Sequence, residues 1–191
     1  MSRKYLPPVH LACGDDEMRP ALMYVEILDG IATATNGYMI CRLNLSEYSN
    51  LDETTLQQLS GMYIHRDAWN LICDAEIITL SDEYDNTLTY VKGGVEANIQ
   101  IKGDNEVKYP DYQSLINKIA NSRFDKKSFI GFDPKWIEIS KKIFQSKTII
   151  IRFYEQESMF TIFPGNDSKA FIGIMPMVLK EEDAVIDFSL S

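Results

Sequence analysis

The chain has 191 residues, of which 45% are hydrophobic, and its formal net charge at pH 7 is −9. This length and composition predict a globular protein with one substantial core or two small ones. No stretch approaches the ~20 apolar residues that a membrane span needs, and Pro7 and Pro8 interrupt the region where a signal peptide is apolar. We therefore expect a cytoplasmic protein with no membrane partner.

Near the N-terminus, residues 9–13 form a possible short strand, and residues 14–17 read as a turn or a helix cap. Residues 23–37 then form an apolar strand, an acidic turn and a second strand that ends at a glycine. The Asp29-Gly30 pair between alternating apolar runs is a strong hairpin signal. A third strand is predicted over residues 38–43, followed by a polar connection over residues 44–60 with a loop or one weak helical turn.

The same hairpin pattern returns at residues 77–93, now preceded by further elements. Residues 62–64 are strand-like, and residues 66–75 place apolar side chains at helical spacing. Strands are predicted over residues 77–80, 87–91 and 95–101, so the order is βαβββ.

A third copy of the unit begins at residue 129. Residues 129–132 are strand-like, Asp133 is a natural N-cap, and Pro134 suits a first helical position, which predicts a helix over residues 134–144. Strands follow over residues 148–153, 159–163, 171–175 and 184–190. The repeats predict an α+β protein built by duplication, with antiparallel sheets outside and helices on one face. Such a shell presents surfaces to partners.

The charge is unevenly distributed along the chain. Residues 117–147 contain eight basic and three acidic residues, a net charge of +5, which leaves −14 for the remainder. A basic segment on an acidic body suits a protein that contacts a polyanion on one face only. A solvated linker followed by an amphipathic helix explains the same pattern and stays open.

Signals for catalysis are weak. Asp15, Asp16 and Glu17 can in principle hold a divalent ion, but a turn or capping cluster fits them better, because a hard cation needs several oxygen ligands. Neither of the two histidines has a zinc ligand at useful spacing, and no phosphate-binding glycine loop or serine-nucleophile elbow occurs. We therefore expect no enzyme, no catalytic residues, no metal site and no cofactor. The three cysteines form no CxxC pair and are predicted to be buried free thiols: Cys13, Cys41 and Cys73.

An apolar run broken by a proline, residues 174–179, is the most unusual candidate surface. Proline ends strand pairing, and two methionines give an adaptable surface suited to short apolar peptides. An edge strand packed on its own core is the alternative.

Three motifs, taken in order, resemble those of the bacterial DNA polymerase sliding clamp, the beta subunit. They are residues 19–22 leading to Ala34-Thr35-Asn36-Gly37-Tyr38, then Lys108-Tyr109-Pro110-Asp111-Tyr112, then residues 175–179. The resemblance covers most of residues 18–179. It implies a DNA-clamp-like fold of βαβββ repeats and a cleft for short apolar motifs of polymerases, the clamp loader and repair proteins. The cleft residues that it implies are Thr35, Gly37, Tyr38, Met39, Met175, Pro176, Met177, Val178 and Leu179.

The resemblance also implies that the helices face duplex DNA and offer Arg66, Lys135, Lys141 and Lys142 to it. It divides the chain into a clamp-like domain over residues 1–115, a basic linker over residues 116–128 and a half-domain over residues 129–191. Family members usually carry Asp-Gly-His-Arg where this chain has residues 36–39, a common proline is replaced by Asn117, and the chain is about half a usual subunit.

The predicted function is thus a clamp-like DNA polymerase processivity factor that forms a homo-oligomer. A clamp-derived peptide-binding adaptor that does not encircle DNA is the alternative.

Overall fold

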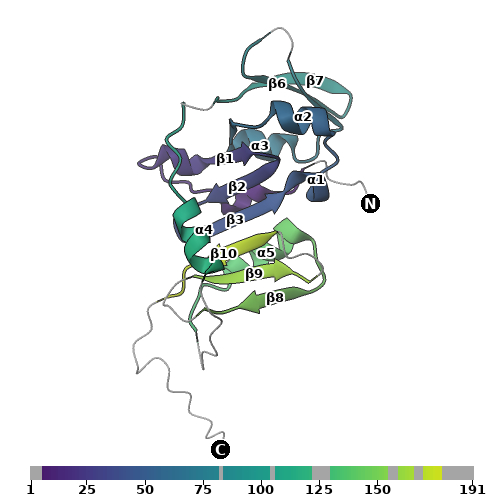
Figure 1. Cartoon of the computed structure of the whole chain (residues 1–191). Coiled ribbons are helices and arrows are strands. Elements are labelled where there is room, and N and C mark those ends of the chain that lie inside the picture. The colour runs from purple at the N-terminus through teal and green to yellow at the C-terminus, as the bar shows by residue number, and fades with distance from the viewer. Residues whose placement is uncertain are drawn as a thin grey trace, which may run out of the picture.

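Two antiparallel sheets form the framework of the computed structural model, which describes residues 6–81, 84–103, 106–121, 130–154, 159–165 and 170–177 (Figure 1). Sheet A has seven strands in the order β4-β1-β2-β3-β10-β9-β8, and sheet B has the three strands β5-β6-β7. Their bounds are β1 Tyr24–Leu28, β2 Ile31–Thr35, β3 Met39–Asn44, β4 Met62–His65, β5 Ile77–Leu80, β6 Thr87–Lys92, β7 Val95–Gln100, β8 Ile149–Arg152, β9 Phe160–Pro164 and β10 Phe171–Ile174.

A three-stranded antiparallel meander occurs three times, as β1-β2-β3, β5-β6-β7 and β8-β9-β10. Two of its hairpins close with two-residue turns whose central residues both have positive φ: Asp29 and Gly30 at 50° and 74°, and Gly93 and Gly94 at 59° and 76°. Positive φ at both positions matches the right-handed twist of the flanking strands. The predicted repeat, the Asp-Gly hairpin and the α+β class are confirmed.

The units exchange strands. β4 precedes α3 (Arg66–Ile72) in the second unit, yet it pairs with β1 of the first unit, with Val25 opposite Ile64. β10 of the third unit pairs with β3 of the first, with Ile172 opposite Cys41. Sheet A therefore continues across the predicted division between residues 1–115 and 129–191.

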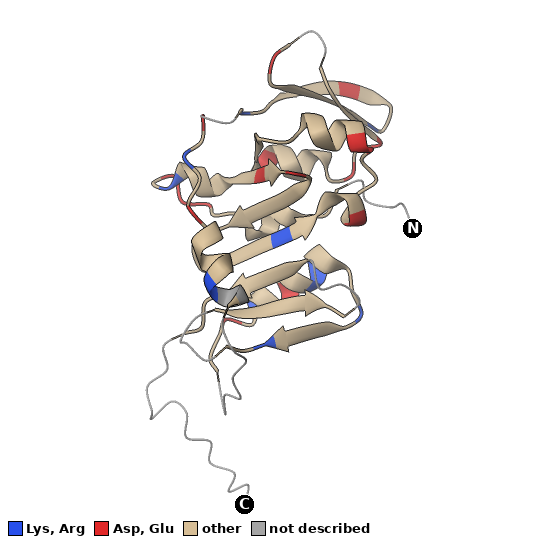
Figure 2. Ribbon diagram, in the orientation of Figure 1, with Lys and Arg blue, Asp and Glu red and all other residues tan. Residues whose placement is uncertain are grey.

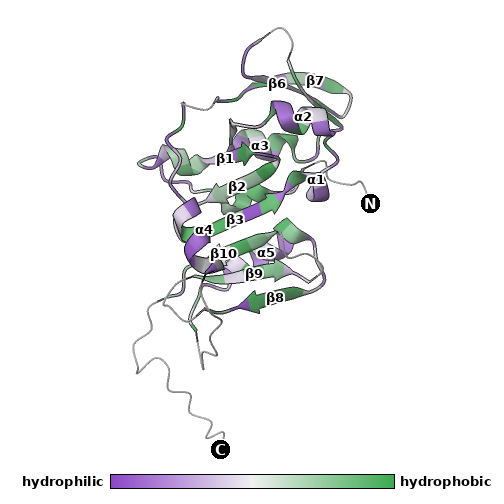
Figure 3. Cartoon of the chain, viewed as in Figure 1, coloured by the Kyte–Doolittle hydropathy of each residue, from purple (hydrophilic) through white to green (hydrophobic). Residues whose placement is uncertain are grey.

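One face of sheet A packs on the main core. Alternate side chains of the central strands lie in this core, among them Val25, Ala34, Cys41, Ile162 and Ile172. The elements that cover this face are α3, α5 (Lys135–Phe144) and the short 3₁₀ helix η1 (Val9–Ala12), which contacts both helices and three strands. Figure 3 shows mostly hydrophobic residues along β8, β9 and β10. The strand period of two explains why one face is continuously apolar.

The opposite face of sheet A carries a smaller cluster around Ile40, Tyr112 and Met159. It packs under α4 (Gln113–Ala120), which Figure 1 shows on the other side of the sheet from α5. This helix was not predicted from the sequence: residues 116–120 belong to α4, so the basic linker predicted from residue 116 begins as helix. Residues 122–128 of that linker lie outside the described residues.

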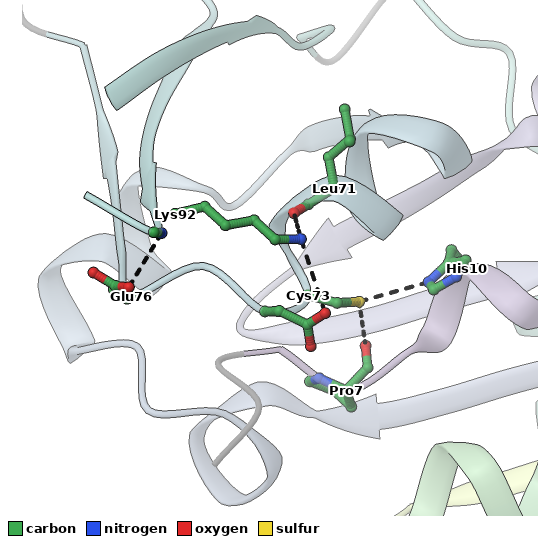
Figure 4. Close-up of polar contacts among 8 residues, drawn as sticks. Pro7, His10, Leu71, Cys73, Glu76 and Lys92 are labelled. Carbon is green, nitrogen blue, oxygen red and sulfur yellow. Dashed lines mark hydrogen bonds and ion pairs between the residues drawn. The ribbon is translucent and has the colours of Figure 1, made fainter. Parts of the chain in front are cut away.

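The N-terminal segment is tied to the second unit (Figure 4). The Pro7 carbonyl accepts a hydrogen bond from Trp69 Nε1 at 2.9 Å. Figure 4 shows Cys73 Sγ, which lies 3.9 Å from that carbonyl and 3.7 Å from His10 Nδ1. Nearby, Lys92 Nζ donates to the Leu71 carbonyl at 3.2 Å, which joins α3 to sheet B. All three cysteines are free and buried, as predicted.

Several predicted elements were wrong in part. Residues 9–13 contain η1 and no strand, because Cys13 N–H bonds back to the His10 carbonyl. The connection over residues 44–60 contains two short helices, α1 (Leu45–Tyr48) and α2 (Glu53–Gln58), capped by Asn44 and Asp52 side chains. Of the strand predicted over residues 129–132, the described part makes one bridge only, between Gly131 and Met177. The strand predicted over residues 184–190 lies outside the described residues.

Candidate functional site

A cavity of about 610 Å³ opens on the face of sheet A that carries the smaller cluster. Five separate parts of the chain line it: residues 19–24, which include the 3₁₀ helix η2 (Pro20–Met23); the β2-β3 turn with the start of β3; Lys102 with residues 106–115; Met159 before β9; and Met175 after β10. This cavity is called the cleft below. Its lining includes five of the nine predicted cleft residues: Thr35, Gly37, Tyr38, Met39 and Met175.

The β2-β3 turn forms a fixed rim of the cleft. Thr35 Oγ1 donates to the Met39 carbonyl at 2.8 Å and accepts from Gly37 N–H at 3.1 Å. Asn36 Oδ1 accepts from the backbone N–H groups of both Tyr38 and Met39 at 2.9 Å. Gly37 has a φ of +90°, a conformation that a side chain disfavours. Tyr38 is held on this rim with its side chain 62% exposed.

The C-terminal lip of the cleft is attached to the same turn. Met175 N–H donates to the Tyr38 carbonyl at 2.8 Å, and the Met175 side chain is 39% exposed. Met177 N–H bonds to the Gly131 carbonyl, and its exposed side chain does not line the cleft, nor does Pro176. The predicted cleft residues Val178 and Leu179 lie outside the described residues.

The floor of the cleft was not predicted from the sequence. It includes Ile40 from β3, Met159 before β9, and Tyr112 and Leu115 at the start of α4. Gly173 of β10 makes room for this floor, because a Cβ atom built there would lie 2.2 Å from Met159 Sδ. The only signal in the sequence was indirect, since Tyr112 belongs to the second of the three motifs.

The charged groups around the cleft are of both signs. The acids make local hydrogen bonds: Glu106 Oε1 accepts from Gly103 N–H and Asn86 Nδ2, and Asp111 accepts from Gln113 N–H and the Ser114 hydroxyl. The Ser114 hydroxyl bond is the main reason that the pKa of Asp111 is lowered. The basic residues are Arg19, Lys102 and Lys108. Arg19 Nε is 3.0 Å from Asp16 Oδ2, and Lys102 Nζ lies 5.2 Å from the Tyr24 ring centroid.

The four residues predicted to face DNA differ in how they are held. Arg66 Nη1 donates to the Gly14 carbonyl at 2.6 Å, and Lys135 Nζ lies 2.9 Å from Asp133 Oδ2 and 4.3 Å from the Trp136 ring centroid. Lys141 and Lys142 are exposed in the last turn of α5. Figure 2 shows basic residues on α4, α5, β8 and β3 and acidic residues on α1 and α2, and α5 also carries the acidic Glu138.

No set of three metal-ligating side chains comes together in the described part of the chain. Asp16, one of the acids weighed as a metal ligand, accepts hydrogen bonds from Met18 N–H at 2.9 Å and Arg19 Nε. These bonds, the backbone one first, lower the pKa of its carboxyl. Nor does any helix within the described residues have the length and apolar character to cross a membrane.

Comparison with solved structures identifies the fold. The DNA polymerase sliding clamp of Bacillus subtilis superposes with a TM-score of 0.55 at 14% identity, over 92% of this chain and 64% of that one. DNA polymerase III subunit beta of Borrelia burgdorferi, solved with a natural product, superposes with a TM-score of 0.55 at 16% identity, over 91% of this chain and 61% of that one. The beta subunit from the DNA polymerase of Streptococcus pyogenes superposes with a TM-score of 0.52 at 15% identity, over 89% of this chain and 61% of that one.

No family model and no curated protein matches the sequence. The chain spans less than two thirds of the length of these three clamp subunits. At 12–16% identity the structural likeness, repeated over clamps from several bacteria, concerns the architecture. The chain has the fold of the bacterial DNA polymerase sliding clamps.

Proposed function

We propose that this chain is a clamp-like, non-enzymatic processivity factor. It binds short apolar peptide motifs of replication or repair proteins in the cleft, and duplex DNA on its helical face, the face of sheet A that α3 and α5 cover. The observation that carries the proposal is the cleft itself. All three motifs that resemble those of clamps contribute residues to the lining of one cavity of about 610 Å³. These residues are 19–22, Thr35, Gly37, Tyr38, Lys108, 110–112 and Met175. Pockets of this volume suit a few apolar side chains.

Peptide binding is tested with a short fluorescein-labelled peptide rich in leucine and phenylalanine, and with the same peptide carrying alanine at those positions. Met175→Glu adds a charge to the lip of the cleft and should weaken binding of the apolar peptide by at least about tenfold, since an unpaired charge then faces apolar side chains. Met18→Glu is the matched control, because Met18 is 88% exposed and does not line the cleft. Equal affinity of parent and Met175→Glu protein would rule out the cleft as the peptide site.

The Met177→Glu variant measures how far the site extends toward the C-terminus. The resemblance predicts that it abolishes binding. The exposed position of Met177 beyond the lining suggests a smaller effect than that of Met175→Glu.

DNA binding is tested by the salt dependence of duplex affinity. Lys141→Glu together with Lys142→Glu should weaken binding and flatten the slope of log affinity against log salt, because fewer phosphate contacts release fewer counterions. Light scattering with and without duplex DNA then measures the oligomer, since a ring requires a closed assembly. A parent protein that has no affinity for duplex DNA at low salt would refute the DNA-binding part.

A peptide-binding adaptor that does not encircle DNA is the second candidate. The observation that favours it is the engagement of Arg66 with a backbone carbonyl and of Lys135 with Asp133 and Trp136, which reduces the basic groups offered by the helical face. A monomer that binds the peptide and shows no duplex affinity is the result expected for the adaptor.

A further inference from the structure

One wall of the cleft is a stretch of chain that lies across sheet A, residues 106–112, called the strap below. Six of its seven residues line the cleft, all except Tyr109. A second cavity, of about 360 Å³, lies on the other side of the strap and is lined by Glu26, Leu28 and Tyr63 together with strap residues. The strap therefore separates two open spaces, and its position sets the width of the cleft.

Side chains attach the strap to the sheet. Within the described residues, no backbone hydrogen bond links residues 106–112 to a strand of sheet A. The Tyr109 hydroxyl instead reaches the carbonyls of Tyr24 and Thr33, each at 3.2 Å. The Tyr112 hydroxyl donates to Glu26 Oε2. An attachment made of a few side-chain bonds can be altered without changing the strands.

Glu26 is the central acceptor of this attachment. It lies on β1 with its side chain only 8% exposed, and its other oxygen, Oε1, accepts from the Tyr63 hydroxyl of β4 at 3.0 Å. Burial first, and then the bond to Glu26, raise the pKa of Tyr112 to about 12, so this phenol stays a donor at neutral pH. A buried carboxylate needs such donors, because an unpaired oxygen there keeps its full desolvation cost.

We propose that Glu26 is a positioning residue for the cleft: by accepting the Tyr112 hydroxyl from behind the strap, it fixes the wall against which an apolar peptide binds. Glu26 itself does not line the cleft. Peptide affinity is therefore coupled to a buried carboxylate outside the binding surface. The inference rests on the proposed peptide-binding function and names the group that controls that site.

Two single-atom deletions separate this role from a general structural one. Tyr112→Phe removes the hydroxyl that ties the strap to Glu26 and keeps the ring that lines the cleft. Tyr63→Phe removes the other hydroxyl that Glu26 accepts, on a strand that does not line the cleft. Both leave one oxygen of the same buried carboxylate unpaired, so their costs in stability should be similar.

Affinity for the leucine- and phenylalanine-rich peptide should fall in Tyr112→Phe by roughly tenfold to 150-fold, the range that corresponds to one lost hydrogen bond to a charged group, and stay unchanged in Tyr63→Phe. Amide hydrogen exchange of residues 106–116 should speed up in Tyr112→Phe only. Glu26→Gln retains an acceptor oxygen and the shape of the side chain. Its peptide affinity and the exchange rate of its strap should therefore lie between those of Tyr112→Phe and the parent.

Equal affinity losses in the two phenylalanine variants, or unchanged exchange of the strap in Tyr112→Phe, would overturn the proposal. If the parent does not bind the peptide, the proposed function fails, and the exchange experiment alone then decides whether Glu26 positions the strap.

Discussion

Gly173→Ala tests the packing that forms the floor of the cleft. Gly173 lies in β10 opposite Ile40 of β3 and Thr161 of β9. A Cβ atom there would lie 2.2 Å from Met159 Sδ and 3.0 Å from Ile40 Cγ2, both closer than van der Waals contact allows. Met159 is buried and lines the cleft, so its side chain must leave the sheet and move into the cavity.

The stability effect can be estimated from two opposing contributions. Overpacking of a buried site costs about 1–3 kcal/mol. The loss of glycine freedom in the unfolded chain returns only about 0.4–1 kcal/mol. We therefore expect a net loss of up to about 2.5 kcal/mol and, at roughly 2–4 °C per kcal/mol for a chain of this size, a fall in Tm of up to about 10 °C.

The assay is thermal unfolding followed by circular dichroism, together with peptide affinity. Gly165→Ala is the control for a clash away from the cleft: its Cβ atom would lie 2.8 Å from Thr148 Cβ, at a residue that does not line the cleft. Both variants should lose stability, and only Gly173→Ala should lose peptide affinity. Combining Gly173→Ala with Met159→Ala should cost less than the sum of the two single changes. A Tm equal to or above that of the parent would refute the packing argument.

Three further predictions concern the core and the strap. Trp69→Phe should lower the free energy of unfolding by about 0.5–1.5 kcal/mol through the lost indole bond, measured by urea denaturation, because the Pro7 carbonyl loses one donor and keeps the Val9 N–H at 2.8 Å. The pKa of Tyr112 in the folded protein is raised from 10 to about 12, so the contribution of its hydroxyl to the free energy of unfolding is complete below pH 10 and is lost as the pH rises to about 12. The difference in free energy of unfolding between the parent and Tyr112→Phe should therefore shrink over that interval. A constant difference would contradict this reasoning. Burial raises the pKa of Cys13 to about 12 and also raises that of Cys41. The three buried thiols, Cys13, Cys41 and Cys73, should therefore react with Ellman's reagent only in denaturant, and a rapid reaction in the folded protein would contradict this expectation.

The sequence predicted the elements whose signals are local. Asp29-Gly30 and Gly93-Gly94 need positive φ, which few residues adopt, so these hairpins could be located from residue types alone. The helix α5 follows an apolar stripe and begins at Lys135, one residue later than predicted. Asp133 Oδ1 accepts from the Lys135 N–H, the bond expected of the predicted N-cap.

The sequence contains capping residues for α4, α1 and α2, but the basic or polar composition of these segments indicated a linker or a loop instead. Asp111 accepts from Ser114 N–H at 3.3 Å, an N-cap pattern that the basic charge of the following segment obscured. Asn44 and Asp52 cap α1 and α2 in the same way, within a stretch whose polarity indicated a loop. Polarity of composition and helical capping are separate signals, and capping decides where a short helix begins.

The cleft was predictable only in part, because it is assembled from distant segments. The resemblance predicted cleft residues in two walls, at residues 35–39 and 175, and did not assign residues 19–22 or 108–112 to the cleft. The floor depends on the pairing of β10 with β3, which brings Met159 next to Ile40 across more than a hundred residues of sequence. No local pattern contains this information, and neither the role of Glu26 behind the strap nor the engagement of Arg66 with Gly14 could be inferred before the strands were placed.

The exchange of strands between units has a consequence for how the molecule can be divided. β4 of the second unit pairs with β1 of the first unit, and β10 of the third unit pairs with β3 of the first unit. The units therefore depend on one another for backbone hydrogen-bond partners. A fragment that stops at residue 121 would leave β3 as an unprotected border with its main-chain groups open to aggregation. Removing a unit from such a fold would preserve the sheet only where the newly exposed edge strand is covered again. Because the units share strands of one sheet, we expect them to unfold in a single cooperative transition.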